Sequence, residues 1–241
     1  MVVGNGAQGQ LQLGGYGDLF DVVHAYVDDG NPLDAETGRL LASIADRVCD
    51  NWQRPDSGMW ELVEHERYTS PKLGCWQALD YAVHLVELGQ LPGGSALWAA
   101  ERERIRAWVQ TDGWSETRQS YVMYPGSERL DASVLLHAAS GFDRGERMSA
   151  TIDAIDSELG RGLLVYRYSG MQREGHLLAC AFWMEEAKAR MGELVTLGND
   201  VGFYVEMMNA ENNEFLGNLP HGLSHLALIY AAITIDVLLV G

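Results

Sequence analysis

Apolar side chains recur at three- and four-residue spacing along almost the whole of this 241-residue chain, and this periodicity constrains its fold most. The clearest apolar stripe lies in residues 34–52 and consists of Leu40, Leu41, Ile44, Ala45 and Val48. Such spacing puts side chains on one face of an α-helix, whereas a strand alternates every second residue. The pattern therefore predicts an all-α protein.

Start and stop signals divide this pattern into eight expected helices. Asp34 is a suitable N-cap, Pro71 lies in a first turn, and Gly89 follows a helix end. The expected helices cover residues 18–27, 34–52, 70–88, 95–109, 131–137, 149–159, 175–191 and 219 to the end. Leu163–Tyr168 is the best strand candidate, but it is short and isolated. No repeat or linker interrupts the chain, so we expect a single domain over residues 1–241.

Composition and charge exclude several classes of protein. A hydrophobic content of 47% is too high for a disordered chain. The 17 basic and 34 acidic residues give a formal net charge of −17, which argues against binding to nucleic acid or to an anionic membrane. Acidity is compatible with a neutral substrate such as a sugar.

Cysteine usage and the terminal segments favour a cytoplasmic protein. Cys49, Cys75 and Cys180 contain no CxxC pair, so neither a disulfide framework nor a cysteine zinc site is expected. The first 15 residues show no signal peptide. The most apolar stretch, residues 223–240, carries His225 and Asp236 and is expected to be a buried helix and not a membrane span.

The inter-helix segments are rich in aromatic residues, which could stack on sugar rings or instead plug the ends of a helical barrel. These residues are Trp60, Tyr68, Trp114, Tyr121, Tyr124, Tyr166, Tyr168, Phe203 and Tyr204.

Motifs for other chemistries are weak or absent. His221 and His225 have the i, i+4 spacing of helical metal ligands, but no acidic third ligand is adjacent. The nucleophile motif GxSxG does not occur, and the glycine-rich segment 6–17 matches neither GxGxxG nor a Walker A loop. We therefore expect no metal and no cofactor.

Eight segments, in order along the chain, together resemble glycoside hydrolase family 15, the glucoamylase-like family that includes bacterial α-glucosidases and some trehalases. They are GNGAQGQLQLGGYGDLFD (4–21), DSGMWE (56–61), YTSPKLGCWQALDYA (68–82), LDASVLL (130–136), LVYRY (164–168), EGHLLACAFWMEEA (174–187), NDVGFYVE (199–206) and LGNLPHGLSHLALIYAA (216–232).

The resemblance implies an (α/α)6 barrel whose active site lies in a funnel at one end. It further implies inverting hydrolysis of a neutral α-glucoside, which could be a maltooligosaccharide, another α-glucan or trehalose. The chain is expected to be the C-terminal portion of that barrel without its first helices. Self-association or a complementing chain could complete the barrel.

The same resemblance assigns the two carboxylates that an inverting glycosidase needs. Glu61 matches the general acid, and Trp60 beside it would provide an apolar wall that keeps an acid protonated. Glu206 matches the general base, which activates water on the opposite face of the sugar. The two carboxyl groups should lie roughly 6.5–9.5 Å apart to leave room for that water.

Five further residues are candidates for substrate binding: Trp60, Tyr68, Lys72, Arg167 and Glu174. The guanidinium of Arg167 suits neighbouring sugar hydroxyls, although Arg167 could instead be a structural ion-pair partner. Lys72 and Glu174 could instead be ordinary charges at helix termini.

The segment between Trp183 and Asn199 is short for the helix, turn and returning helix that it should contain. One helix over residues 175–198 would rise by about 1.5 Å per residue and carry Glu206 away from Glu61, whereas a turn near Gly192 would leave a return helix of only about one and a half turns, so that the loop must stretch. The alternatives to an enzyme are therefore a catalytically inactive remnant that binds carbohydrate or a partner, and a plain helical scaffold.

Overall fold

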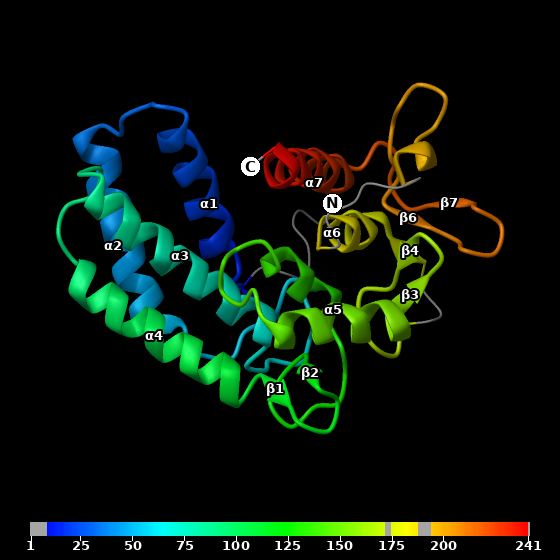
Figure 1. The fold of residues 1–241 in the computed structure, drawn as a ribbon, viewed down its shortest axis with the longest axis horizontal. Coiled ribbons are helices and arrows are strands. Elements are labelled where there is room, and N and C mark those ends of the chain that lie inside the picture. Colours follow the sequence, from blue (N-terminus) through cyan, green and yellow to red (C-terminus); the bar gives the residue numbers. More distant parts are fainter. Residues whose placement is uncertain (1–8, 172–174, 188–193, 241) are drawn as a thin grey trace. The chain divides into compact units, whose positions relative to one another are not determined.

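The computed structural model describes residues 9–171, 175–187 and 194–240 (Figure 1). The chain divides into two compact units. The N-terminal unit comprises Met1–Trp114 and Tyr124–Gly126, and the C-terminal unit comprises Ser115–Met123 and Ser127–Gly241. The expectation of a single domain over residues 1–241 stays a prediction.

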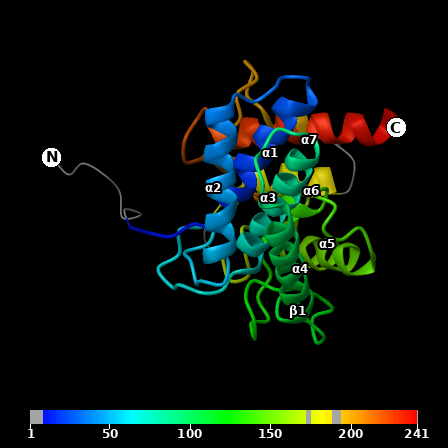
Figure 2. The ribbon, with the colours of Figure 1, turned by 90° about the vertical axis from the view of Figure 1, so that its left-hand side faces the viewer.

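Helix α3 (Thr69–Glu87) is the centre of the N-terminal unit (Figures 1 and 2). It packs against α1 (Gly15–Asp28), α2 (Ala35–Asn51) and α4 (Ser95–Thr111). All four helices were expected and lie close to their expected bounds. Leu40, which was expected in the apolar stripe of α2, is 60% exposed. The Asp34 side chain accepts hydrogen bonds from the backbone N–H groups of Glu36 and Thr37, both at 2.9 Å, which confirms it as the N-cap of α2.

Glycines allow α1 and α3 to approach very closely. A Cβ atom on Gly17 would lie 2.9 Å from the Cα atom and from the carbonyl oxygen of Gly74. Three to four residues later, the amide of Gln77 donates to Asp21 at 3.4 Å. One turn further, the rings of His24 and Tyr81 stack with centroids 4.3 Å apart. The matching steps show that the two helices run side by side in the same direction.

The C-terminal unit contains a buried helix, α6 (Leu178–Ala187), which packs against α7 (Gly222–Val240) and η1 (Ala132–His137). The unit also contains helix α5 (Glu146–Leu159) and the 3-10 helix η2 (Leu194–Leu197). Its two-residue strands are β2 (Ser120–Tyr121), β3 (Gly160–Arg161), β4 (Leu164–Val165), β5 (His176–Leu177), β6 (Met207–Met208) and β7 (Phe215–Leu216). Strand β1 (Trp114–Ser115) has one residue in each unit.

Several local expectations for this unit are corrected. Residues 132–137 form a 3-10 helix, capped by Asp131, whose carboxylate accepts from the backbone N–H of Ser133 at 2.9 Å. The strand expected at 163–168 is limited to Leu164–Val165, and it is not isolated because it pairs with β3 in antiparallel register. Strands β5, β6 and β7 form a three-stranded sheet whose two-residue strands are too short to show alternation.

Helix α7 was expected to be buried, but only one of its faces is. Ala227 and Ala231 are buried, whereas Leu226, Ile229 and Ile233 are 65%, 55% and 60% exposed. The buried face therefore consists of small residues together with Ile235, whereas these three large apolar residues are exposed. Within the described ranges, no helix is both long and apolar enough to cross a membrane.

The helix expected at 175–191 starts at Leu178, because residues 176–177 belong to β5. Residues 188–191 lie outside the described part. Leu194–Leu197 form a 3-10 helix, so one α-helix does not run through to residue 198.

Candidate active site

Glu61 lies in the turn-rich loop between α2 and α3, in a backbone conformation that non-glycine residues seldom adopt. Its φ angle is +54°, in the left-handed region. The turn is closed by a hydrogen bond from the Leu62 N–H to the Ser57 carbonyl at 2.9 Å. Glu61 is exposed and Trp60 beside it is half-buried. Strained backbone of this kind concentrates at functional sites, where the surrounding structure maintains it.

The segment before α1 packs on this loop. The side-chain amide of Gln12 donates to the Glu61 carboxylate at 3.4 Å, and that of Gln10 donates to the Glu61 carbonyl at 3.2 Å. The backbone N–H of Leu13 donates to the buried Asp56 carboxylate at 3.0 Å. The segment before α1, which lies over 40 residues earlier in the sequence, therefore holds the loop of the candidate acid in place.

Tyr68 lies under the same loop, immediately before α3, and is 2% exposed. Its hydroxyl donates to the Glu64 carbonyl at 2.9 Å. Its ring meets Tyr124 edge-to-face, with centroids 5.8 Å apart. Burial is the main cause that raises the pKa of Tyr68 to about 12, so the hydroxyl remains a proton donor.

Lys72 and Asp56 are both fully buried in this region. The Lys72 ammonium donates to the Arg54 carbonyl at 2.7 Å and so ties the loop to the first turn of α3. Burial lowers the pKa of Lys72, an effect that Asp56 opposes. Burial likewise raises the pKa of Asp56, with Lys72 and the Leu13 N–H opposing it. Sequence reasoning did not single out Asp56, although it begins the segment DSGMWE.

Glu206 is half-buried and directly precedes β6. Its Oε2 atom accepts from the Asn218 backbone N–H at 3.0 Å and from the Asn218 side-chain amide at 2.7 Å. The Glu206 N–H donates back to the Asn218 carbonyl at 2.9 Å. Gly217 has a φ angle of +78°, which favours glycine, and a Cβ atom there would lie 2.7 Å from Oε2 and displace the carboxylate. Asn218 therefore orients this carboxylate.

Arg167 follows β4, and its carbonyl accepts from the Ala132 N–H at 2.8 Å. It is half-buried. Burial raises the pKa of the Cys180 thiol, Asp131 raises it further and Arg167 opposes both, so both charged groups act on this thiol. Glu174 lies outside the described residues.

The structure therefore groups the predicted site residues in two sets. Trp60, Glu61, Tyr68 and Lys72 belong to the N-terminal unit, and Arg167 and Glu206 belong to the C-terminal unit. The distance expected between the carboxyl groups of Glu61 and Glu206 stays a prediction. Asn218 and the glutamines at positions 10 and 12 were missed, although they lie within quoted motif segments.

Comparison with known proteins identifies the class. Residues 1–198 match the family Glycosyl hydrolases family 15, and the chain belongs to this family. A trehalase of Thermoplasma acidophilum is 30% identical over 95% of the chain, and a trehalase of Mycolicibacterium smegmatis is 31% identical over 96%. The chain spans only 43% and 37% of these two relatives.

Solved structures of glycosidases share the fold. A glycosidase variant in complex with glucose matches 97% of the chain and 69% of its own length, with a TM-score of 0.82 and 19% identity. Glucoamylase from Saccharomycopsis fibuligera matches 95% of the chain and 70% of its own length, with a TM-score of 0.69 and 13% identity. The expected all-α fold, part of an (α/α)6 barrel, is confirmed.

Proposed function

We propose that the chain carries the catalytic carboxylates of an inverting α-glucosidase, with Glu61 as general acid and Glu206 as general base. Family membership supports the reaction class. The observation that carries the site is the strained, hydrogen-bonded position of Glu61 in an exposed loop. A side chain held there at a cost in backbone energy is suited to a defined chemical task.

In this mechanism, the Glu61 carboxyl protonates the glycosidic oxygen as the C1–O bond breaks. Glu206 removes a proton from a water molecule, which attacks C1 from the opposite face of the ring. The anomeric carbon inverts, so an α-glucoside releases β-glucose. Each turnover consumes one water, and the two carboxyl groups regain their starting states by proton exchange.

The proposed first substrate is trehalose, since trehalases are the curated relatives of this chain. Maltose and longer α-glucans are the alternatives. We propose that Trp60, Arg167 and Glu174 bind the sugar, with an aromatic face against its ring and charged groups at its hydroxyls. Tyr68 and Lys72 are almost fully buried, and we propose that they support the wall of the sugar pocket from behind.

Glucose release from trehalose, maltose and maltotriose tests the substrate. The proposal expects release from at least one of these α-glucosides and none from cellobiose, whose linkage is β. Absence of release from all three, together with calorimetric binding of a sugar, would favour an inactive carbohydrate-binding remnant. Absence of both release and binding would leave only a helical scaffold.

Asn218→Ala is expected to lower kcat for that α-glucoside by about 10-fold to 100-fold. A hydrogen bond to a charged group contributes roughly 1.5–3 kcal/mol, and the remaining backbone N–H of residue 218 keeps part of the orientation. Steady-state kinetics check this result, with Asn212→Ala as a control on the exposed part of the same β6–β7 region. An unchanged kcat in Asn218→Ala would show that Glu206 needs no such orientation.

A second candidate function, as an interaction module that pairs with itself or with a complementing chain, is favoured by the exposed apolar face of α7. Exposed apolar surface of this kind promotes association. We expect Ile229→Glu to shift the sedimentation of any assembled species toward the monomer. Val63→Glu is the control, because Val63 is 89% exposed and belongs to the N-terminal unit, whereas α7 belongs to the C-terminal unit. Equal behaviour of the two variants would remove this argument.

A further inference from the structure

Helices α1 and α3 bring together two imidazoles and a carboxylate away from the Glu61 loop. One ligand atom from each of His24, Asp28 and His84 lies within 4.8 Å of the others. The Nδ1 atom of His24 is 3.4 Å from a carboxylate oxygen of Asp28. The ring centroids of His24 and His84 are 5.3 Å apart. All three side chains reach solvent, with exposed fractions of 22%, 54% and 45%.

The helix register holds these groups together. The close contact of Gly17 with Gly74 fixes the spacing of α1 and α3, and His24 lies two turns beyond it. Tyr81, one turn before His84, stacks on the His24 ring at 4.3 Å and limits its rotation. Rigid secondary structure of this kind positions ligands more accurately than loops do.

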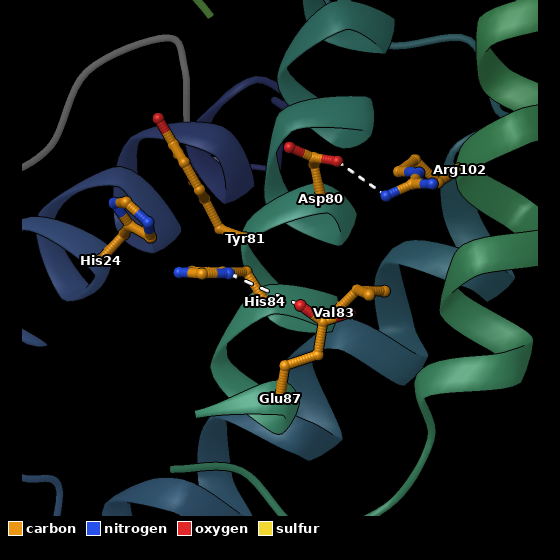
Figure 3. A pocket seen from close by; sticks show the side chains of 7 residues that line it. All are labelled: His24, Asp80, Tyr81, Val83, His84, Glu87 and Arg102. Carbon is orange, nitrogen blue, oxygen red and sulfur yellow. Dashed lines mark hydrogen bonds and ion pairs between the residues drawn. The ribbon is translucent and has the colours of Figure 1, made fainter. Parts of the chain in front are cut away.

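A pocket of about 290 Å³ lies beside the cluster (Figure 3). Its lining includes both histidines, together with Asp80, Glu87 and Arg102 from the same unit. Asp80 forms an ion pair with Arg102, with a nitrogen-to-oxygen distance of 2.7 Å. The Nδ1 atom of His84 lies 3.7 Å from the Glu87 carboxylate, and Figure 3 shows its other ring nitrogen on the side of α1. A carboxylate beside one imidazole nitrogen keeps the proton there and leaves the other nitrogen for a metal.

We propose that His24, Asp28 and His84 bind a divalent transition-metal ion of the zinc class. Imidazole nitrogens and a carboxylate oxygen are ligands that such ions prefer, at distances of about 2.0–2.2 Å. Small side-chain rotations bring three atoms that are already within 4.8 Å of one another to these distances. Water from the adjacent pocket completes the coordination. The net charge of −17 favours any cation.

The proposed ion would clamp the last turns of α1 and α3 to each other. Asp28 is the last residue of α1, and His84 lies in the last turn of α3. Ligands from two helices make metal binding and the folded helix pair mutually dependent. This role is separate from hydrolysis, which is proposed to need no metal. A test of the metal site is therefore independent of the proposed function.

Titration calorimetry of the full chain with zinc chloride tests the site. We expect one zinc ion per chain, and at least a tenfold weaker affinity in each of His24→Gln, His84→Gln and Asp28→Asn. Asp29→Asn is the matched control, because it neutralises an exposed carboxylate adjacent to Asp28 that is not in the cluster. Its affinity should equal that of the unaltered chain.

Two further readouts separate this site from other zinc ligands and from misfolding. Zinc should raise the melting temperature of the unaltered chain and of Asp29→Asn, but raise it less in His84→Gln. With cobalt in place of zinc, the absorption spectrum should show visible bands without a thiolate charge-transfer band. Unchanged zinc affinity in the two histidine variants, no binding at all, or a thiolate band that indicates a cysteine ligand would each overturn the proposal.

Discussion

Glu61→Gln is expected to lower kcat/KM for the hydrolysed α-glucoside by about 10²-fold to 10⁴-fold, the range that general acid catalysis contributes. Glutamine keeps the shape of the side chain and its contact with Gln12, but it cannot donate the required proton to the leaving oxygen. The loss should therefore appear in kcat more than in KM. Initial-rate kinetics with trehalose or maltose measure it.

The substitution Glu64→Gln is the matched control, because Glu64 is an exposed carboxylate three residues along the same loop. Its backbone carbonyl accepts the Tyr68 hydroxyl, and that bond is unaffected by the change. We expect this variant to retain its rate. Equal losses in both variants, or full activity in Glu61→Gln, would remove Glu61 from the role of general acid.

Gly74→Ala is expected to destabilise the protein by about 1–3 kcal/mol, even though alanine is the better helix former. A Cβ atom at this position would lie 2.9 Å from the Gly14 carbonyl oxygen, which belongs to the backbone and cannot rotate away. The helix pair α1/α3 must then separate. Urea unfolding followed by circular dichroism measures the change in the free energy of unfolding.

Gly15→Ala provides the opposite expectation within the same helix pair. Gly15 is exposed in the first turn of α1, and a Cβ atom there would meet nothing within 4 Å. This variant should be neutral or more stable by roughly 0.5–1 kcal/mol. If Gly74→Ala behaves in the same way, close backbone contact is not what sets the spacing of α1 and α3.

The N-terminal helices could be predicted from the sequence because helical apolar spacing and capping residues mark where they lie. The buried face was predicted only in part: Leu41, Ala45 and Val48 of α2 are buried, whereas Leu40 of the same expected stripe is 60% exposed. The polar cap Asp34 marks where α2 begins, since its side chain satisfies N–H groups that the helix itself cannot.

The C-terminal unit was harder to predict, because its elements are short or lack an apolar stripe. Residues 178–184 of helix α6 are all apolar and all buried, so this part of the pattern has no preferred face. Helix α7 is also largely apolar, and its composition does not reveal that Leu226 and Ile229 are exposed. Two-residue strands such as β6 leave no periodic signal.

The candidate site could be predicted in part. Trp60 and Glu61 are neighbours in the chain, and the resemblance identified them as one motif. The contacts that support them come from remote segments, such as Gln12 to Glu61. The same reason hid the cluster of His24 and His84, which are 60 residues apart and meet only because of the helix register. Contacts between distant segments depend on packing, which a single sequence does not display.

The stereochemistry of the first product tests the central proposal most directly. Proton nuclear magnetic resonance should record equal amounts of β-glucose and α-glucose released from trehalose before mutarotation, because only the unit that water attacks inverts. Both signals should be absent in Glu61→Gln and in Glu206→Gln. This result is predicted because water attacks the anomeric carbon opposite to the leaving oxygen. Initial release of α-glucose alone, or β-glucose release that persists at full rate in both variants, would contradict the two-carboxylate inverting mechanism.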